Sequence, residues 1–480
     1  MSELRPRPLW REVTFDEPCV AYRKLRSADS IVFESVKGPE SIARYSFVCI
    51  EPYLCLKVTD EGIEIDVEGR KTVSQRPPLA RLRELIDSYR QETIDGLPPF
   101  QGGAAGLLTY DFVHYIEKLP RAAKDDLGVP YAHFYMFDRV VSFDHLARRA
   151  WVIVCPGARE NALGYSELVK TEDDLLGEAK ENLDRICRRL EGPAVTTSSS
   201  NLPSAPIVIA QDVEKDAYMS IVRKVKDYIA SGDIFQANLS LRVSAPLGGR
   251  DPWRLYEILR EINPSPFACF GDFRDYQIVS SSPERLVRVR DGKVDTRPIA
   301  GTRPRGRDGR EDELMRAELL LSDKERAEHI MLIDLERNDL GRVCAYGSIG
   351  VDELMVTEDY SHVIHIVSNV KGLLAAGKDC FDVIRAVFPG GTITGVPKVR
   401  CMEIIDELET MRRGPYTGSM GYIGFGGAMD MNIIIRTFLI AKDSAYIQAG
   451  AGIVADSDPE REYYESLKKA EALIRTLERL

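Results

Sequence analysis

The chain has 480 residues, 44% of them hydrophobic and 29% charged, which is the composition of a globular protein with an ample core. Its net charge of −11 argues against a general nucleic-acid binder, which would be basic, so we expect no nucleic-acid partner. No run of about 18 apolar residues occurs, and the first residues lack the apolar core of a signal peptide. We therefore expect a cytoplasmic location and no membrane partner.

The nine cysteines are scattered without a CxxC pair, and the six histidines form no HExxH motif. Such a set predicts reduced, buried thiols and argues against a disulfide scaffold or a zinc hydrolase. An acidic protein that handles an anion must then concentrate positive charge, or a metal ion, at one site.

In chain order, the first region alternates turn residues with strand-like runs at 31–33, 45–50 and 151–155. A charged helical pattern follows at about 172–190, and residues 192–206 are rich in Ser, Thr and Pro with almost nothing to bury. The sequence predicts three parts: an N-terminal region at 1–190, a linker at 191–211 and a C-terminal region at 212–480.

The C-terminal region mixes helices with strands predicted at 277–280, 433–439 and 446–449. Its last helix, predicted over 459–480, carries an apolar stripe at i, i+3, i+4 spacing. Strands and helices of similar weight without a regular βαβ rhythm indicate an α+β fold rather than a doubly wound sheet.

Two pairs of glutamates are candidate metal ligands. Glu325 and Glu328 lie three residues apart in one predicted helix, and Glu462 and Glu465 repeat this spacing in the last helix. Residues three apart share a helix face, so two such helices could hold Mg²⁺, a hard cation that takes oxygen ligands. The alternative is a solvated, salt-bridged face, since Lys and Arg residues flank the pairs.

Two cations are candidates for the complementary positive charge. Arg436 interrupts an otherwise apolar strand, where an arginine is costly to bury unless it meets an anion or a structural partner. Lys469 follows Glu465 by four residues, which is also the spacing of a simple helical ion pair. Backbone N–H groups could bind a small anion in three glycine-rich segments predicted as turns, at 298–302, 389–395 and 449–453.

Taken together, motifs between residues 231 and 469 resemble the chorismate-utilising family of anthranilate, aminodeoxychorismate, isochorismate and salicylate synthases. In order they are SGDIFQANLS, SSSPERL, RPIAGTRPRG, KERAEHIMLIDLERNDLGR, YSHVIHIVSN, FPGGTITGVPK, GSMGYIGF and GAGIVADSDPEREYYESLKKA. The resemblance covers nearly the whole chain. It implies an α+β fold in which a two-sheet sandwich is flanked by helices, with the catalytic region at 212–480.

The resemblance implies how the substrate would be held. Glu328 and Glu465 would bind Mg²⁺ directly, Glu325 and Glu462 would hold metal-bound water, and the metal would bind the ring carboxylate of chorismate. Lys469 would add positive charge near the metal. The pyruvyl carboxylate would be held by Arg436, Tyr416 and backbone N–H groups around Gly450 and Gly452.

The resemblance also implies catalytic roles. Glu284 would act as the general acid that protonates the departing C4 hydroxyl, because hydroxide is a poor leaving group. Its surroundings must keep this carboxyl group protonated. His365 would lie near the ring and take part in elimination, and Thr302 would line the pocket.

By the resemblance, the residue at position 236 distinguishes family members that add water to chorismate from those that add ammonia, and here it is Gln236. Family members that add water carry a lysine there as a base, whereas glutamine cannot accept a proton at neutral pH and ammonia needs no base. This resembles the aminating branch. It contains aminodeoxychorismate synthase, which aminates C4 on the folate (p-aminobenzoate) pathway, and anthranilate synthase, which aminates C2 and releases pyruvate on the tryptophan pathway.

The choice between these two members rests on short segments. Ala300 in PIAGT favours anthranilate synthase, because many aminodeoxychorismate synthases use a lysine nucleophile there. Segments such as NPSPFA and TGSMGY favour aminodeoxychorismate synthase. Our prediction is aminodeoxychorismate synthase component I, a transferase, with anthranilate synthase component I, a lyase, as the alternative.

Both members take ammonia from a glutamine amidotransferase. The sequence holds no Gly-x-Cys-x-Gly elbow, so the resemblance implies a separate amidotransferase subunit in a heterodimer or larger complex. A remote alternative from another class is a non-catalytic chorismate- or tryptophan-binding protein.

A second site is suggested near the N-terminus. VFES at 32–35 and RYSF at 44–47 resemble the family's tryptophan pocket, which NPSPF at 263–267 would complete. In anthranilate synthases this pocket gives feedback inhibition, and in some folate-branch enzymes it holds tryptophan as a structural ligand. The candidate residues are Glu34, Ser35, Pro266 and Phe267; the alternative is an ordinary aromatic core.

Overall fold

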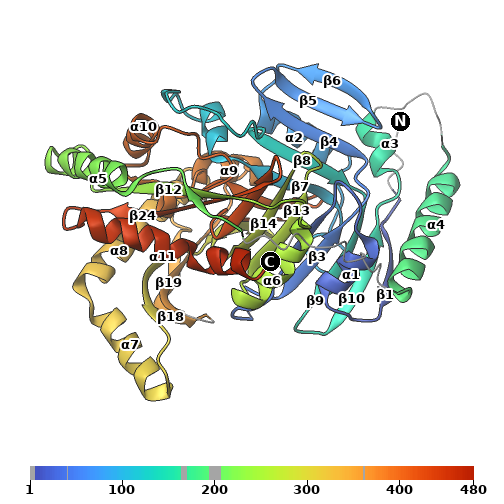
Figure 1. Cartoon of the computed structure of the whole chain (residues 1–480). Helices are drawn as coiled ribbons and strands as arrows, with labels where there is room; N and C mark the ends of the chain where they lie inside the picture. Colours follow the sequence, from blue (N-terminus) through green and yellow to red (C-terminus); the bar gives the residue numbers. More distant parts are fainter. Residues whose placement is uncertain (1–5, 41, 164–169, 194–206, 361–362) are drawn as a thin grey trace.

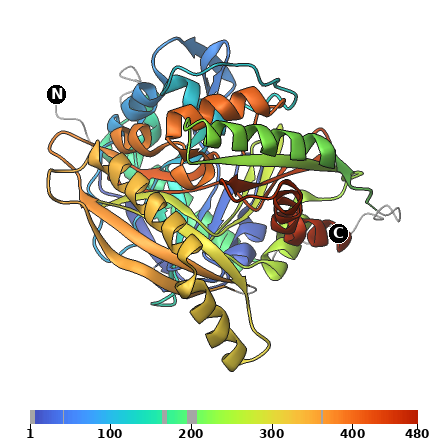
Figure 2. The ribbon, with the colours of Figure 1, turned by 90° about the vertical axis from the view of Figure 1, so that its left-hand side faces the viewer.

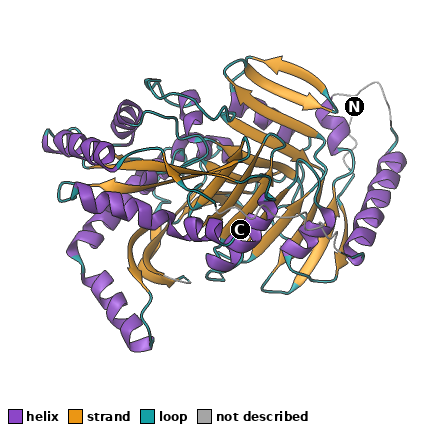
Figure 3. Cartoon of the chain, viewed as in Figure 1, coloured by secondary structure: helices purple, strands orange, loops and turns teal. Residues whose placement is uncertain are grey.

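The computed structural model describes residues 6–40, 42–163, 170–193, 207–360 and 363–480. Strands fill its middle and helices cover the outside (Figures 1 and 3). The strands form two sheets of twelve, paired antiparallel. The predicted α+β fold with two large sheets and flanking helices is confirmed.

The first sheet carries the strand of Gln236. Its spatial order is β1 (Leu9–Val13), β10 (Arg149–Val154), β9 (Arg139–Asp144), β3 (Tyr45–Cys49), β2 (Ile31–Glu34), β13 (Phe267–Asp272), β14 (Tyr276–Ser282), β23 (Thr437–Ala441), β24 (Ser444–Ile453), β12 (Gln236–Pro246) and β11 (Ala210–Gln211). A short strand, β20 (Gly395–Val396), also pairs with β12.

The second sheet carries the strands of Thr302 and His365. Its order is β17 (Ile299–Pro304), β19 (Val363–Leu373), β16 (Lys293–Thr296), β15 (Arg285–Arg290), β22 (Met429–Asn432), β21 (Ser419–Gly424), β7 (Gly103–Leu108), β8 (Ala132–Phe137), β4 (Leu54–Thr59), β5 (Gly62–Val67) and β6 (Arg70–Ser74). The long strand β18 (Gly350–Asp359) pairs with β19.

Both sheets combine strands from before and after the predicted linker at 191–211. For example, β13 pairs with β2, and β21 pairs with β7. Residues 194–206 of that linker lie outside the described residues. The division into regions therefore remains a prediction about sequence organisation.

Helices cover the sheets. They are α1 (Pro18–Leu25), α2 (Pro78–Asp87), α3 (Ala158–Leu163), α4 (Glu172–Glu191), α5 (Lys215–Ala230), α6 (Pro252–Ile262), α7 (Gly309–Leu321), α8 (Asp323–Gly341), α9 (Cys380–Val387), α10 (Lys398–Leu408) and α11 (Pro459–Glu478), with 3₁₀ turns η1 (Tyr110–Tyr115) and η2 (Gly391–Ile393). The helices predicted over 172–190 and 459–480 are confirmed within two residues. After a quarter turn, α5 and α11 still lie side by side (Figure 2).

The ends of two helices are fixed by local chemistry. Ser322 caps α8 by accepting a hydrogen bond from the Glu325 backbone, and Asp458 caps α11 by accepting from the Glu460 and Arg461 backbones. Pro459 occupies the first turn of α11, where its missing N–H costs nothing. These caps set the positions of the two glutamate pairs along their helices.

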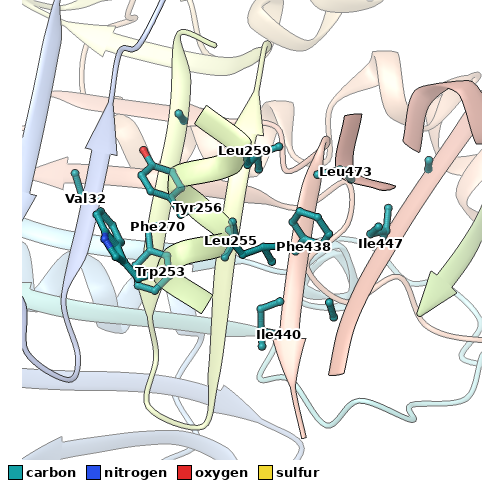
Figure 4. Packing of buried hydrophobic residues seen from close by; sticks show 14 of the residues in the cluster. Val32, Trp253, Leu255, Tyr256, Leu259, Phe270, Phe438, Ile440, Ile447 and Leu473 are labelled. Atoms are coloured by element: carbon teal, nitrogen blue, oxygen red, sulfur yellow. The ribbon is translucent and has the colours of Figure 1, made fainter. Parts of the chain in front are cut away.

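The core beside α11 is apolar and closely packed (Figure 4). Trp253 and Leu255 of α6 pack against Phe270 of β13 and Phe438 of β23, and Leu473 of α11 joins the same cluster. Burying one such side chain stabilises the fold by about 1.5–3 kcal/mol. This packing holds α11 in place over β24.

Two further expectations concern thiols and membranes. All nine cysteines are free, eight of them buried and Cys55 partly buried, so the predicted reduced thiols are confirmed. Within the described chain, none of the helices has the length and apolar character needed to cross a membrane.

Candidate active site

The glutamate pair of α8 meets strand β12. The Gln236 side-chain amide donates a hydrogen bond of 3.1 Å to Glu328 Oε1. Burial raises the pKa of Glu328, and the negative charge of Glu325 raises it further. The two glutamates therefore form a local concentration of negative charge beside an uncharged amide.

The second pair, on α11, approaches the first. Burial raises the pKa of Glu462, and Glu465 adds a like-charge contribution. The positive charges of Lys324 and Lys469 oppose this rise in both Glu328 and Glu462, so the two pairs share one electrostatic environment. Glu465 is the most open member: its side chain is 55% exposed and forms an ion pair of 2.9 Å with Lys469.

These four carboxylates have donor chemistry that fits Mg²⁺. They supply only oxygen ligands. Burial is the main cause of the raised pKa values of Glu328 and Glu462, and a neighbouring glutamate raises each further, so a nearby cation would favour their charged forms. No preformed cluster of three or more His, Cys, Asp or Glu suited to a metal exists within the described residues. Mg²⁺ in proteins keeps several waters and is bound by one or two carboxylates together with the substrate. A site with two direct carboxylate ligands is therefore consistent with its usual coordination.

Arg436 lies in the connection between β22 and β23, not within a strand as predicted. The strand predicted over 433–439 is wrong in its first half, since β23 begins at Thr437 and Arg436 has a φ of 53°. Its guanidinium donates 2.8 Å to the Lys469 carbonyl and forms no ion pair with any described residue. Burial lowers its pKa, while Tyr416, Glu284 and Glu465 act in the opposite direction. A cation without a carboxylate partner is suited to an anionic ligand.

The predicted glycine-rich turn at 449–453 is part of β24, which corrects the prediction. Gly450 and Gly452 pair with Ser240 and Asn238 of β12 as ordinary strand residues. Lys469 Nζ donates 3.0 Å to the Gly450 carbonyl. The segment 298–302 likewise enters a strand, β17. In these strands glycine lets neighbouring atoms approach the backbone closely, and it does not reverse the chain direction.

Glu284 follows strand β14 and is buried, with 5% of its surface exposed. It accepts a hydrogen bond of 2.9 Å from the Thr392 hydroxyl of η2. Burial raises the pKa of Glu284 to about 8, and the nearby negative charge of Glu336 acts in the same direction. At neutral pH this carboxyl group is predominantly protonated, which is the state that a general acid requires.

His365 and Thr302 face each other across β17 and β19. His365 Nδ1 lies 3.0 Å from Thr302 Oγ1 and 3.2 Å from the Gly301 carbonyl. Burial lowers the pKa of His365 to about 4, so the ring is neutral. Donation from Nδ1 to a carbonyl leaves Nε2 with a free lone pair. Ala300, on the same strand, is buried and carries no amine.

The same strand reaches the glutamates. A Cβ added to Gly301 would lie 3.0 Å from Glu325 Oε2, so Glu325 packs directly against β17. Arg303 of β17 also forms an ion pair of 3.3 Å with Glu325. Strand β17 therefore lies beside Glu325, and the Gln236 amide joins β12 to Glu328 on the same helix.

Arg413 and Glu409 form a buried ion pair that supports the site, and neither residue was predicted. Arg413, 2% exposed, forms a double hydrogen bond with Glu409 and donates to the carbonyls of Ile393 and Asn238. Its guanidinium also lies 5.7 Å from the centre of the Tyr416 ring. No local sequence pattern marks this role, because the Ile393 and Asn238 carbonyls that Arg413 bonds belong to distant segments.

A separate cavity of about 370 Å³ lies at the N-terminal candidate site. All four predicted residues line it, together with the aromatic rings of Phe33, Tyr45, Phe47 and Tyr422. The Glu34 carboxylate is already bonded to Tyr256 at 2.7 Å and Arg260 at 2.8 Å. Arg288, Arg290 and Glu40 also line the cavity; Arg288 is paired with Asp295 at 2.9 Å and Arg290 with Asp291 at 3.7 Å.

The sequence profile described as "chorismate binding enzyme" matches residues 40–475. The chain belongs to the chorismate binding enzyme family. It is a chorismate-utilising enzyme, and the matched range includes both glutamate pairs, Gln236 and Arg436.

Characterised members of the family are similar over nearly their full length. Aminodeoxychorismate synthase component 1 of Bacillus subtilis (strain 168) is 42% identical over 476 residues, covering 98% of this chain and 97% of the relative. Anthranilate synthase component 1 of Thermus thermophilus is 43% identical over 488 residues, covering 100% and 99%. Both kinds of enzyme are thus equally similar in sequence.

A solved structure of the family shares the fold. The crystal structure of anthranilate synthase component I from Streptococcus pneumoniae TIGR4 superposes with a TM-score of 0.78 at 34% identity. The match covers 96% of this chain and 99% of the other. The two-sheet architecture is therefore the family's architecture.

Proposed function

We propose that this enzyme aminates chorismate with ammonia in a magnesium-dependent reaction and releases 4-amino-4-deoxychorismate. The observation that carries this proposal is the Gln236 amide, hydrogen-bonded to Glu328 inside the carboxylate cluster. An amide cannot deprotonate water at neutral pH, whereas ammonia attacks without a base. The position therefore favours an aminating enzyme over a hydrating one.

The substrate is a dicarboxylate, and two positive regions would bind its ends. Mg²⁺ held by Glu328 and Glu465, with Glu325 and Glu462 behind bound water, would supply positive charge for the ring carboxylate. Arg436, whose guanidinium lacks a carboxylate partner among the described residues, would hold the pyruvyl carboxylate.

The departing hydroxyl needs a proton, and Glu284 would donate it. Burial raises the pKa of Glu284 to about 8, so the carboxyl group is protonated at neutral pH. The C–O bond breaks as this proton is transferred, and the hydroxyl leaves as water. Thr392 orients the carboxyl group through its hydrogen bond.

The alternative product is anthranilate, formed after amination at C2 with loss of pyruvate. Two observations favour it. Ala300 offers no amine to act as a covalent nucleophile, and neutral His365, with its Nε2 lone pair free, is suited to remove a ring proton in the elimination.

The decisive experiment incubates the purified chain with chorismate, Mg²⁺ and ammonium at alkaline pH. We expect a product that a separate lyase converts to p-aminobenzoate. Fluorescent anthranilate would overturn the C4 assignment in favour of the alternative. Unchanged chorismate, with tight binding by calorimetry, would instead support the non-catalytic alternative and reject both enzymes.

Ammonia would come from a glutamine amidotransferase subunit. The names of the similar relatives, component 1, imply a second component in those enzymes. We expect glutamine to replace ammonium only when such a subunit is added. Glutamine-dependent turnover by the chain alone would contradict this part of the proposal.

We also propose that the 370 Å³ cavity binds tryptophan. Its aromatic walls suit an indole, and arginine and acidic side chains at its rim suit the carboxylate and ammonium groups of an amino acid. Ser35 and Pro266 form its edge, with the Ser35 hydroxyl donating to the Tyr45 and Pro266 carbonyls.

A further inference from the structure

Two amide oxygens on strand β12 stand out because they are buried and unbonded. Gln236 is 4% exposed and Asn238 is 9% exposed. Gln236 Oε1 and Asn238 Oδ1 are both shielded from solvent, and neither has a hydrogen-bond partner in the described part of the chain. Leaving a buried acceptor unpaired costs about 1–3 kcal/mol, so two adjacent ones indicate that a donor is missing.

The two side chains lie on the same face of β12. Residues two apart in a strand point the same way. The residue between them, Ala237, and the next one, Leu239, pack into the apolar core on the opposite face. Gln236 and Asn238 therefore form a polar row that faces the candidate active site.

Strand β24 provides the room for this row. A Cβ at Gly452 would lie 2.2 Å from Gln236 Nε2, and a Cβ at Gly450 would lie 3.0 Å from Asn238 Oδ1. A Cβ at Gly452 would collide with the Gln236 amide, so glycine there gives the amide room. At Gly450 the closest clash would be with the Leu239 backbone carbonyl at 2.2 Å, and Asn238 Oδ1 would be a tight contact.

A single small molecule with at least two hydrogens could donate to both oxygens. Other polar groups of the same two residues already have hydrogen-bond partners. Gln236 Nε2 donates to Glu328, and the Asn238 backbone carbonyl accepts from Arg413. Ammonia can donate to both amide oxygens and still keep its lone pair free. Water bound in the same way would lack a base to activate it, since neither amide accepts a proton.

We propose that Gln236 Oε1 and Asn238 Oδ1 together bind the ammonia nucleophile, with Asn238 as the second residue of that site. This inference rests on the proposed amination. As the ammonia lone pair forms the C–N bond, the ring C–O bond breaks and its electron pair leaves with the Glu284 proton as water. The new ammonium group then returns one proton to the Glu284 carboxylate, which balances the reaction.

The test compares Michaelis constants for ammonia and for chorismate. Asn238→Leu keeps the side-chain volume but removes the acceptor, so the KM for free ammonia should rise about 3- to 10-fold, as expected for one lost hydrogen bond. The KM for chorismate, measured at saturating ammonia, should change less than about twofold. A matched rise in the chorismate KM would instead assign Asn238 to the substrate and overturn the proposal.

A conservative variant and a control make the result specific. Asn238→Asp keeps an oxygen at the same place, so the KM for ammonia should stay near the wild-type value even if added charge weakens chorismate binding. Gln448→Leu on β24 changes an amide whose donor is already bonded to Ser240 at 2.8 Å, and both constants should remain unchanged. An increase in the ammonia KM in Gln448→Leu as large as in Asn238→Leu would overturn the proposal.

Failure of this inference can be told from failure of the proposed function. If wild-type enzyme does not consume chorismate with ammonium, the amination proposal itself fails. If wild-type enzyme turns over but Asn238→Leu leaves the ammonia KM unchanged, amination stands and the two-oxygen site is rejected. Thermal unfolding of each variant confirms that it is folded before kinetics are compared.

Discussion

The hydroxyl of Thr392 donates a hydrogen bond of 2.9 Å to Glu284 Oε1. The preceding residue, Gly391, packs against a second buried carboxyl group, since a Cβ there would lie 3.5 Å from Glu336 Oε1. The 3₁₀ turn η2 therefore contacts two buried carboxyl groups, those of Glu284 and Glu336. Their mutual repulsion adds to burial in raising the pKa of Glu284.

Replacing Glu284 by Gln should abolish most turnover while keeping the fold. Gln accepts the Thr392 hydrogen bond but cannot give a proton, so we expect kcat to fall about 10²- to 10⁴-fold. Rates are compared at several pH values with free ammonia held constant. In the proposed mechanism only the protonated Glu284 carboxyl group is active, and its pKa is about 8, so wild-type activity should decline as the pH rises through 8. A flat profile across this range would remove the acid role.

The same variant should be more stable than wild type at alkaline pH. Between the ordinary carboxyl pKa of 4.5 and about 8, the folded state binds a proton that the unfolded state has released. Wild-type stability therefore falls as pH rises through this window, whereas Glu284→Gln loses no such contribution. Denaturant unfolding at pH 9 should show a gain on the order of 1–3 kcal/mol. Equal stability at pH 9 would mean that burial does not penalise the ionised acid.

Much of this site follows from sequence, and the rest depends on contacts between distant segments. The glutamate spacing and the apolar stripe place both pairs on helices, because i, i+3 periodicity is local information. The family motifs indicated separate roles for Gln236 and Glu328, but their hydrogen bond was not predicted. Arg413 is an example of a residue whose role could not be predicted. It donates to the carbonyls of Ile393 and Asn238, which belong to other segments, and no local sequence pattern predicts these contacts.

Two errors have a common physical origin. The run 449–453 was predicted as a turn because glycine favours chain reversal. In β24, however, Gly452 makes room for the Gln236 side chain and Gly450 for the Leu239 backbone carbonyl of β12. The run 433–439 was predicted as one strand because it is apolar. Its first half instead connects two sheets through a left-handed Arg436, a conformation that a hydrophobic pattern cannot reveal.

Glu328→Gln and Glu465→Gln should each abolish turnover and weaken divalent-cation binding. Each substitution would remove one of the two proposed direct oxygen ligands of Mg²⁺, and that loss should outweigh any gain from reduced repulsion between the carboxylates. Mn²⁺ titration followed by electron paramagnetic resonance gives a readout independent of activity. Glu471→Gln on the same helix, where Glu471 pairs with Lys468 and Arg475, is the control and should bind normally. Near-normal rates in either test variant would reject the metal assignment.

Arg413→Met should destabilise the protein by about 3–5 kcal/mol, because it leaves the Glu409 carboxylate buried without its partner. Urea unfolding measures the loss. The double variant Arg413→Met/Glu409→Leu should recover part of it, since the uncompensated charge is gone. Arg337→Met, at an exposed ion pair with Asp334, should change the free energy of unfolding by less than about 0.5 kcal/mol. A double variant as unstable as the sum of its parts would contradict this account.

Tryptophan should raise the melting temperature if it occupies the N-terminal cavity. At a hundredfold excess over its dissociation constant, a ligand specific to the folded state adds about 2.7 kcal/mol. Ser35→Leu removes the hydroxyl that bonds the Tyr45 and Pro266 carbonyls at the cavity edge and should abolish the shift. Alanine serves as the control ligand, because it lacks an aromatic ring. An equal shift with alanine would show that the effect is not specific to the cavity.

The two glycines of β24 should respond differently to alanine, although they lie two residues apart. A Cβ at Gly452 meets the end of the flexible Gln236 side chain at 2.2 Å, so the amide can swing away at small cost to the fold. A Cβ at Gly450 meets the Leu239 backbone carbonyl at 2.2 Å, which cannot move without disturbing the pairing of β12 and β24. Gly452→Ala should therefore lose the contact with Glu328 and at least about tenfold in kcat/KM while keeping its melting temperature within a few degrees. Gly450→Ala should lose stability first, by about 1–3 kcal/mol. Reversal of this order would mean that the amide position does not depend on the space at Gly452.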